Sequence, residues 1–314
     1  MGGEAAASRA PVIATIGMAT LDHLYVLADH PKPDSVNPAL EYHTEVGGTA
    51  GRGAVAAKRL GGATRLLAAC GTGVHAEILK AHLQAEGVEC TWVTYDQPSQ
   101  HSAVMVVPGD ATRTIIWLPQ PMADGRMIER LPAFLDGVDV ALVDATDEAL
   151  ASAALDECDK RRITTVIDTG SGRPWTAGLL GRGDHVIAPE KYALKESGHQ
   201  AERAALELWG GHGRVVFAVT QGPRGGVFTT SKRPESLRRW AAVPVAGVDS
   251  CGAGDTFHGA YAWALAMGRS PAECFDTAAW SAALKVTQLG NKGIPTLDQL
   301  DDARRSSVGG SRGG

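Results

Sequence analysis

The chain has 314 residues, 44% of them hydrophobic and 21% charged, and a formal net charge of −5 at pH 7. This balance is typical of soluble globular proteins and excludes a disordered or fibrous body. Scattered lysines and arginines give no basic stripe for nucleic acid, and no run of about 18 apolar residues is present to span a membrane. The five cysteines form no C-x-x-C pair, which argues against a disulfide framework or a zinc site. We therefore expect a cytoplasmic enzyme without nucleic-acid or membrane partners.

Short apolar strands alternate with helical patterns along most of the chain, which predicts a mainly parallel sheet covered by helices on both faces. The predicted strands are 12–17, 64–70, 138–145, 163–169, 184–188 and 214–220. The first predicted helices are 51–62 and 75–87. We expect one domain over residues 12–300 with the architecture of a three-layer α/β/α sandwich, and flexible tails at 1–11 and 301–314.

Two stretches interrupt this alternation. Residues 101–118 contain two strand-like runs joined by Pro-Gly-Asp-Ala, which predicts a hairpin, and residues 33–46 form a further extended segment. Strands inserted into a parallel-sheet protein commonly cover a ligand cleft, so we expect these segments to form a small lid. The alternative is an edge extension of the main sheet with no separate role.

Residues 249–255, Asp-Ser-Cys-Gly-Ala-Gly-Asp, stand directly before an apolar helical run. A turn of small residues at a helix N-terminus leaves backbone N–H groups unpaired, and these groups bind anions such as phosphate. Asp255, which follows Gly252, Ala253 and Gly254, is then placed to accept a proton from an attacking hydroxyl group. The alternative is that Asp255 only caps the helix.

Other glycine-rich turns occur at 45–62 and 219–226, as a site for two substrates requires. No Gly-Lys-Ser/Thr follows a glycine-rich loop, so a kinase of this kind is not a P-loop enzyme.

The stretch 70–76, Cys-Gly-Thr-Gly-Val-His-Ala, matches the dinucleotide-binding fingerprint, with Glu89 further on. Because that match is isolated and internal, a dehydrogenase is the weaker interpretation.

Taken together, these motifs resemble those of the ribokinase/PfkB carbohydrate kinases. Residues 249–265 are similar to the carboxy-terminal signature of the family, and residues 45–62 are similar to its amino-terminal Gly-Gly signature. Among subfamilies the resemblance is nearest to ketohexokinases and sulfofructose kinases. It implies a ribokinase-like fold, ATP- and Mg²⁺-dependent phosphorylation of a primary hydroxyl of a small sugar, and a homodimer formed through the lid.

The resemblance also implies roles for matching residues. Asp255 is the expected catalytic base, and the amides of Gly252, Ala253 and Gly254 are the expected anion hole. The expected sugar-binding residues are Asp22, Gly47 and Gly48, to which the positions of Asp144 at a strand end and His101 in the lid add two candidates. The expected nucleotide-binding residues are Thr220, Gly222, Gly225, Ala282 and Ala283.

Arg52 stands where the family commonly carries Asn or Asp against the sugar. Arginine binds carboxylate, phosphate and sulfonate groups in a bidentate manner, so an anionic sugar is one interpretation. The other is an ion pair between Arg52 and a lid acid such as Glu45.

Two further departures concern ions. The Asn-x-x-Glu motif that the family associates with its metal is missing, which leaves Glu190 as a weak candidate for Mg²⁺. Cys251 stands where the family usually has Thr. In many members Asp249 and the loop at 285–294 together form a site for a monovalent cation such as K⁺, and the change at Cys251 affects the loop next to it. These departures keep a catalytically weak, sugar-binding regulatory protein as an alternative, and Trp117 and Tyr42 in the lid keep a nucleoside kinase as another.

Overall fold

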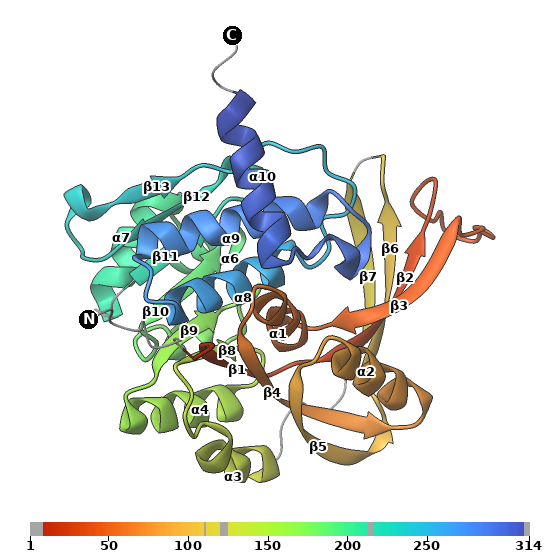
Figure 1. Ribbon diagram of the computed structural model, residues 1–314, viewed down its shortest axis with the longest axis horizontal. Coiled ribbons are helices and arrows are strands. Elements are labelled where there is room, and N and C mark those ends of the chain that lie inside the picture. Colours follow the sequence, from red (N-terminus) through yellow and green to blue (C-terminus); the bar gives the residue numbers. More distant parts are fainter. Residues whose placement is uncertain (1–8, 110, 120–124, 213–215, 311–314) are drawn as a thin grey trace, which may run out of the picture.

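The computed structural model describes residues 9–109, 111–119, 125–212 and 216–310, and in this part of the chain nine strands form one sheet (Figure 1). The strand order is β13-β12-β11-β10-β9-β8-β1-β4-β5. Strands from β5 to β11 in this order run parallel, and β12 is antiparallel to both of its neighbours, β11 and β13. The strands are β1 (Val12–Ile16), β4 (Ala63–Thr72), β5 (Glu89–Pro98), β8 (Val140–Asp144), β9 (Thr164–Asp168), β10 (His185–Pro189), β11 (Val216–Thr220), β12 (Gly226–Thr229) and β13 (Arg238–Trp240).

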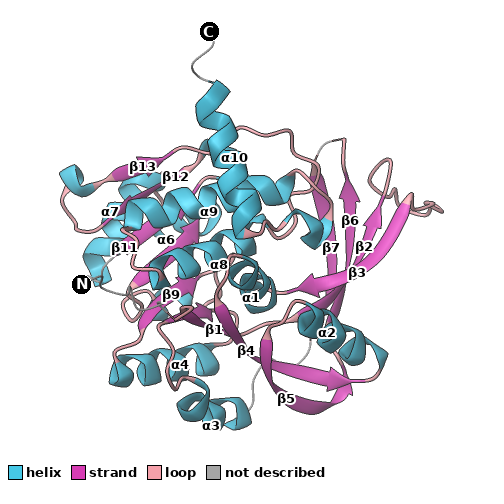
Figure 2. Cartoon of the chain, viewed as in Figure 1, coloured by secondary structure: helices cyan, strands magenta, loops and turns pink. Residues whose placement is uncertain are grey.

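Helices cover both faces of this sheet, which gives the expected three-layer sandwich (Figure 2). One face packs against α1 (Thr49–Arg59), α2 (Val74–Ala85), α8 (Ala253–Ala266), α9 (Pro271–Val286) and α10 (Leu297–Gly310). The other packs against α3 (Gly125–Phe134), α4 (Glu148–Arg161), α5 (Thr176–Leu179), α6 (Glu190–Ser197) and α7 (Ala201–His212). Short 3-10 turns are η1 (Gly222–Arg224), η2 (Pro234–Ser236) and η3 (Gly290–Gly293). None of the helices in the described ranges combines the length and apolar character needed to cross a bilayer.

A second, four-stranded sheet in the described residues forms the lid, in the order β3-β2-β6-β7. Its strands are β2 (Thr20–Val26), β3 (Glu41–Gly47), β6 (His101–Val107) and β7 (Thr112–Leu118). The predicted hairpin is confirmed by β6 and β7, although residue 110 of its turn lies outside the described residues. The segment predicted as extended at 33–46 becomes a strand only at Glu41, because three prolines at 31–38 cannot donate to a ladder, and β2 was not expected.

The lid is amphipathic, because alternate residues of a strand point to opposite faces. Its inner face packs Leu24, Val26, Val104 and Val106 against buried Cys251, so it lies directly over the loop that leads into α8. Arg113 on β7 also donates to the Ser250 hydroxyl group, at 3.0 Å. These contacts hold the lid against the turn that the sequence singles out as an anion-binding loop.

The prediction of a flexible tail from residue 301 is wrong for its first ten residues, since α10 continues to Gly310. The reason is burial: Leu300 is fully buried, and both Leu300 and Leu297 pack in the hydrophobic cluster that also contains residues of α8 and α9. Residues 1–8 and 311–314 of the predicted tails lie outside the described residues.

Candidate active site

The carboxyl ends of neighbouring parallel strands bring several predicted site residues to one edge of the large sheet. Asp144 ends β8 and Thr220 ends β11, and Asp168, which sequence reasoning missed, ends β9 between them. Helix α8 begins beside this edge: the ring of His258, on its second turn, lies 3.0 Å from the Asp168 carboxylate. Ligands of open α/β sheets bind outside the carboxyl ends of the strands, so this edge is the expected position of a site.

Asp255 lies in the first turn of α8, directly after the Gly-Ala-Gly turn. The first N–H groups of an α-helix have no partner within the helix, so the amides of this turn and the Asp255 carboxylate are presented together. Gly252 is the N-cap, with φ of 74°, and a Cβ atom there would lie 2.6 Å from the Arg52 side chain. The positive φ and the close approach of Arg52 each require glycine at this position.

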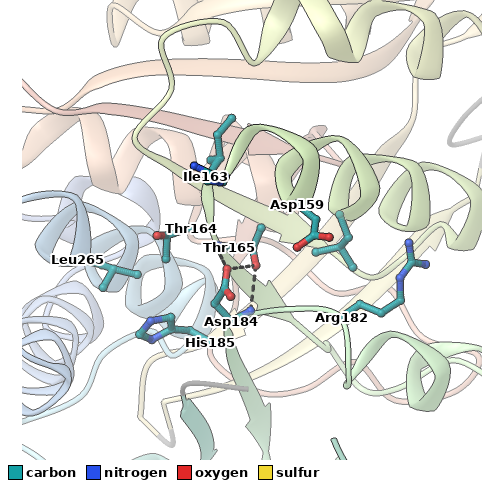
Figure 3. Close-up of a pocket in the computed structure, with 10 residues that line it drawn as sticks. Asp159, Ile163, Thr164, Thr165, Arg182, Asp184, His185 and Leu265 are labelled. Atoms are coloured by element: carbon teal, nitrogen blue, oxygen red, sulfur yellow. Dashed lines mark hydrogen bonds between the residues drawn. The ribbon is translucent and has the colours of Figure 1, made fainter. Parts of the chain in front are cut away.

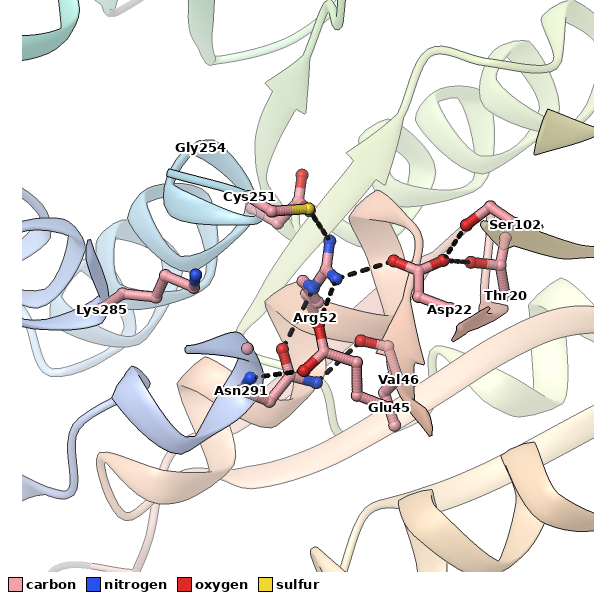
Figure 4. Close-up of polar contacts among 12 residues, drawn as sticks. Thr20, Asp22, Glu45, Val46, Arg52, Ser102, Cys251, Gly254, Lys285 and Asn291 are labelled. Atoms are coloured by element: carbon pink, nitrogen blue, oxygen red, sulfur yellow. Dashed lines mark hydrogen bonds and ion pairs between the residues drawn. The ribbon is translucent and has the colours of Figure 1, made fainter. Parts of the chain in front are cut away.

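Arg52 on α1 is 3% exposed and lies at the centre of a cluster of carboxylates (Figure 4). Its Nη2 donates to Asp22 at 2.7 Å and to Glu45 at 2.8 Å. Its Nη1 lies 3.5 Å from the Asp255 carboxylate. The remaining contacts are Nε to the side-chain oxygen of Asn291, at 3.1 Å, and Nη1 to the sulfur of Cys251, at 3.6 Å.

The pairing of Arg52 with Glu45, one of the two interpretations of the sequence, is therefore present, and Asp22 joins it. The second carboxylate oxygen of Asp22 accepts hydrogen bonds from Thr20 at 2.7 Å and Ser102 at 2.5 Å. Gly47 leaves the space for this carboxylate, because a Cβ at that position would lie 2.2 Å from it. Asp255, with a side chain 22% exposed against 6% for Asp22 and 7% for Glu45, is the most accessible of the three carboxylates.

Gly48, another predicted sugar-binding residue, is the N-cap of α1, next to this cluster. Asp144 is buried at the end of β8 and accepts hydrogen bonds from the backbone N–H groups of Met18 at 3.1 Å and Thr146 at 2.9 Å. Burial raises the pKa of Asp144 to about 6. Burial likewise raises the pKa of the neighbouring Asp168, and the nearby imidazole of His258 acts in the opposite direction by lowering that pKa.

His101 does not join this cluster. It is next to Ser102 on β6, and its side chain therefore points to the outer face of the lid, where its ring lies 4.2 Å from that of His75. Tyr42 is also on the outer face, hydrogen-bonded to His23 at 2.8 Å. Trp117 is the direct cross-strand partner of Ser102, so it shares the inner face with Asp22.

The predicted nucleotide residues lie further along the same side of the molecule. Thr220 ends β11, Gly222 begins the η1 turn that follows it, and Gly225 is the C-cap of that turn. Ala282 and Ala283 lie on α9, Ala283 being 8% exposed and Ala282 partly buried. Their contact with a nucleotide stays a prediction.

Glu190, the weak metal candidate, is already paired, because its carboxylate accepts a hydrogen bond from Gln221 at 2.7 Å and forms an ion pair with Arg224. Among the described residues, no group of three or more His, Cys, Asp or Glu side chains is arranged to hold a metal ion. Magnesium in phosphoryl transfer is held mainly by phosphate oxygens and water with one or two carboxylates, so a preformed cage is not required.

The candidate site for a monovalent cation contains a lysine. The Nζ atom of Lys285 lies 2.8 Å from the carboxylate and 3.0 Å from the carbonyl oxygen of Asp249. Sequence reasoning missed Lys285, although its position in the apolar run Ala-Ala-Leu-Lys-Val of α9 indicates a buried charge that needs a partner.

A separate hollow of about 480 Å³ lies at the opposite edge of the sheet (Figure 3). It is lined by residues at the amino ends of β9 and β10, among them Thr165, Asp184 and His185. Asp184 is held there by hydrogen bonds from the N–H and hydroxyl groups of Thr165, both at 2.9 Å. None of the predicted site residues lines it, and we assign it no role.

In the described residues, Asp255 thus follows a Gly-Ala-Gly turn at a helix N-terminus beneath a strand lid, an arrangement suited to phosphoryl transfer. A model of the pfkB family carbohydrate kinases matches residues 11–297. The chain therefore belongs to the PfkB family of carbohydrate kinases and is a phosphotransferase that acts on a sugar.

Individual relatives agree with this assignment. The chain is 23% identical to the ribokinase of Bacillus subtilis over 297 residues, which cover 92% of this chain and 98% of that one. Its fold matches a protein from Agrobacterium tumefaciens that carries a provisional ribokinase name, with a TM-score of 0.86, 25% identity, and coverage of 96% and 99% of the two chains. It also matches the Arabidopsis thaliana ribokinase complexed with ribose and ATP, with a TM-score of 0.75, 22% identity, and coverage of 94% and 98%. The expected nearness to ketohexokinases and sulfofructose kinases stays a prediction.

Proposed function

We propose that this protein transfers the γ-phosphoryl group of ATP to a primary hydroxyl of a small, uncharged sugar. The observation that carries the proposal is the position of Asp255, partly exposed in the first turn of α8 and directly after the Gly252–Gly254 turn. The use of ATP is supported by the ATP complex of the Arabidopsis relative.

In this proposal Asp255 removes the proton from the sugar hydroxyl, and the oxygen attacks the γ-phosphorus atom in line. The bond between that phosphorus and the oxygen that bridges it to the β-phosphate breaks, and ADP leaves. The first-turn amides of α8 stabilise the charge on the phosphoryl oxygens. Mg²⁺, when bound with ATP, would neutralise part of the charge on the phosphates. The lid, which packs on Cys251, excludes water from the transfer.

The charge balance around Arg52 supports an uncharged sugar over an anionic one. Three carboxylates, those of Asp22, Glu45 and Asp255, face a single guanidinium group. An anionic substrate group at this point has to compete with two ion pairs that are already formed and buried, and meets an excess of negative charge. Sugar hydroxyls can instead donate to the carboxylates.

We also propose that two copies pair through their lids in the cytoplasm. Strand β7 is an edge of the lid, and Ile116 and Leu118 on its outer face are 64% and 47% exposed. An exposed apolar edge strand is normally covered by a partner. All five cysteines are free, as in a reducing compartment.

The test is ADP release across a panel of ketoses, aldoses, sugar acids, sulfo-sugars and nucleosides, run beside Asp255→Asn. Turnover of one neutral sugar, lowered by several powers of ten in Asp255→Asn with nucleotide binding retained, supports the proposal. Selective turnover of a sugar acid or sulfo-sugar overturns the uncharged-sugar part. Near-normal turnover by Asp255→Asn overturns the role of the base.

A further inference from the structure

We propose that the ammonium group of Lys285 takes the place of a monovalent cation in this protein and holds the anion-binding turn in its active shape. The kinase therefore needs no K⁺. The proposal rests on the proposed kinase function for its catalytic readout, but its structural basis is a buried ion pair.

Lys285 and Asp249 are both fully buried, with 0% of each side chain exposed. Lysine and aspartate side chains are almost never buried to this extent unless they are paired. Here the Lys285 ammonium donates to two oxygens of one residue, the Asp249 carboxylate at 2.8 Å and its carbonyl at 3.0 Å. A carboxylate and a carbonyl oxygen that converge on one point form a site for a cation of single charge, and the lysine occupies that point.

Asp249 connects this charge to the anion-binding turn. One of its carboxylate oxygens accepts a hydrogen bond from the N–H group of Cys251 at 2.8 Å. The other accepts one from the N–H group of Gly290 at 2.9 Å, so the η3 turn is fixed by the same carboxylate. Because Cys251 directly precedes the Gly252 N-cap of α8, the position of Asp249 determines where the amides of the turn point.

The backbone around Asp249 is anchored to the helix that carries Lys285. The N–H groups of Val248 and Asp249 both donate to the carbonyl oxygen of Val286, at 2.7 Å and 3.1 Å. Lys285 and the residue that anchors its acceptor Asp249, Val286, are thus neighbours on α9. Figure 4 shows the Lys285 side chain extending from α9, beside the Arg52 cluster. A K⁺ ion at the two Asp249 oxygens has to displace this ammonium, so the residues present do not fit the expected K⁺ site.

Lys285 is therefore a positioning residue: it acts on phosphoryl transfer through Asp249 and the amides of the turn. Wild-type protein is the first test, at constant ionic strength in potassium, sodium and tetramethylammonium chloride. We expect equal kcat and equal melting temperature in the three salts. Activation by potassium, or a melting temperature raised specifically by potassium, overturns the proposal.

Two variants separate the effect of the Lys285 charge from the effect of the volume that its side chain fills. Lys285→Met keeps the unbranched apolar stem of the side chain without its charged end, and we expect kcat to fall by about 10²-fold in every salt, as for a misplaced catalytic group. Lys285→Ala opens a space beside the Asp249 oxygens, and we expect potassium to restore part of its kcat and to raise its melting temperature. The exposed Lys232, changed to Met, is the matched control and should behave as wild type in every salt.

Lys285→Met with wild-type kcat, or Lys285→Ala with the same melting temperature in potassium and tetramethylammonium, contradicts the proposal. If neither variant folds, the melting temperature of wild-type protein in the three salts decides alone. If no sugar in the panel is phosphorylated, the proposed function fails, whereas the melting temperatures still decide whether Lys285 replaces the cation.

Discussion

The Arg52 guanidinium group on α1 and the Asp22 carboxylate on β2 lie 2.7 Å apart, so a buried ion pair joins the helix layer to the lid. The same nitrogen of Arg52 reaches Glu45 on the neighbouring lid strand at 2.8 Å. Asn291 of η3 completes the arrangement by donating to the carbonyl oxygen of Val46 at 2.7 Å and accepting from Arg52. Arg52 therefore adds a buried ionic link to the apolar packing and hydrogen bonds that hold the lid over the turn before Asp255.

Replacing Arg52 by alanine leaves the carboxylates of Asp22 and Glu45 buried without their cationic partner. Removing one partner of a buried ion pair costs about 3–5 kcal/mol, and we expect a decrease of that size in the free energy of unfolding. Denaturant unfolding measures it. Arg305→Ala is the control, since Arg305 forms an exposed pair with Asp302, with side chains 69% and 72% exposed, and should change stability by less than about 1 kcal/mol. Equal effects of the two substitutions would show that the buried Arg52 ion pairs contribute no more to the free energy of unfolding than an exposed ion pair does.

The two glycines of the anion-binding turn should respond differently to alanine. At Gly252 the backbone has φ of 74° and a Cβ meets Arg52 at 2.6 Å, so Gly252→Ala should lower both the melting temperature and kcat. At Gly254 a Cβ meets no atom within 4 Å, so Gly254→Ala should keep or raise the melting temperature by removing a helical glycine. Its methyl group nevertheless enters the space where phosphate is proposed to bind, so kcat should fall. Loss of activity without loss of stability is the result to look for in calorimetry and ADP-release assays.

A normal kcat for Gly254→Ala would remove the first turn of α8 from the proposed anion site. A normal melting temperature for Gly252→Ala would show that the loop accommodates a side chain by moving away from Arg52.

The sequence predicted the parallel sheet and the Asp255 turn because both depend on local pattern: apolar strand runs, and small residues before a helix. It did not predict β2, whose Leu-Asp-His-Leu-Tyr run acquires its meaning only from pairing with β3 and β6, about 20 and 80 residues further on. It also left Arg52 between two interpretations. The ion pair exists because the lid places Glu45 and Asp22 against Arg52, which is a property of tertiary structure, whereas the charge of the sugar stays a prediction.

His101 shows the same limit. Its place at the start of the hairpin suggested contact with the sugar, but the register of β6 with β2 sets which residues face inward, and Ser102 takes that position. A shift of one residue along a strand exchanges its two faces. Spacing within one segment does not fix that register.

The proposed dimer can be tested at β7. Ile116→Lys places a charge on the exposed outer face of the lid, where the native side chain is 64% exposed and contributes little to the core of its own subunit. We expect the mass in sedimentation equilibrium to shift from dimer to monomer, with the melting temperature of the monomer close to that of wild type at low concentration. Val36→Lys is the control, since Val36 is 98% exposed and lies outside the lid strands. A wild-type protein that is monomeric at micromolar concentration would contradict the proposal.

Stability should fall in mild acid because of His185, which is buried at the amino end of β10 and shares a hydrogen bond with Tyr261 at 2.8 Å. Burial lowers the pKa of His185 from 6.5 to about 4. Between these values the unfolded chain takes up a proton that the folded protein does not, so stability is complete above pH 6.5 and is lost as the pH falls towards 4. The loss has an upper bound of about 3 kcal/mol.

The comparison with His185→Gln isolates this contribution. Glutamine keeps an acceptor for the Tyr261 hydroxyl group but does not titrate, so its free energy of unfolding should depend less on pH in this window. Asp144 contributes with the opposite sign, because burial raises its pKa to about 6 and the stability it provides is lost as the pH rises, but it does so equally in both proteins. The difference between the two urea unfolding curves, followed from pH 7 to pH 4, therefore measures His185. A constant difference across that range would mean that His185 is not held neutral by the fold.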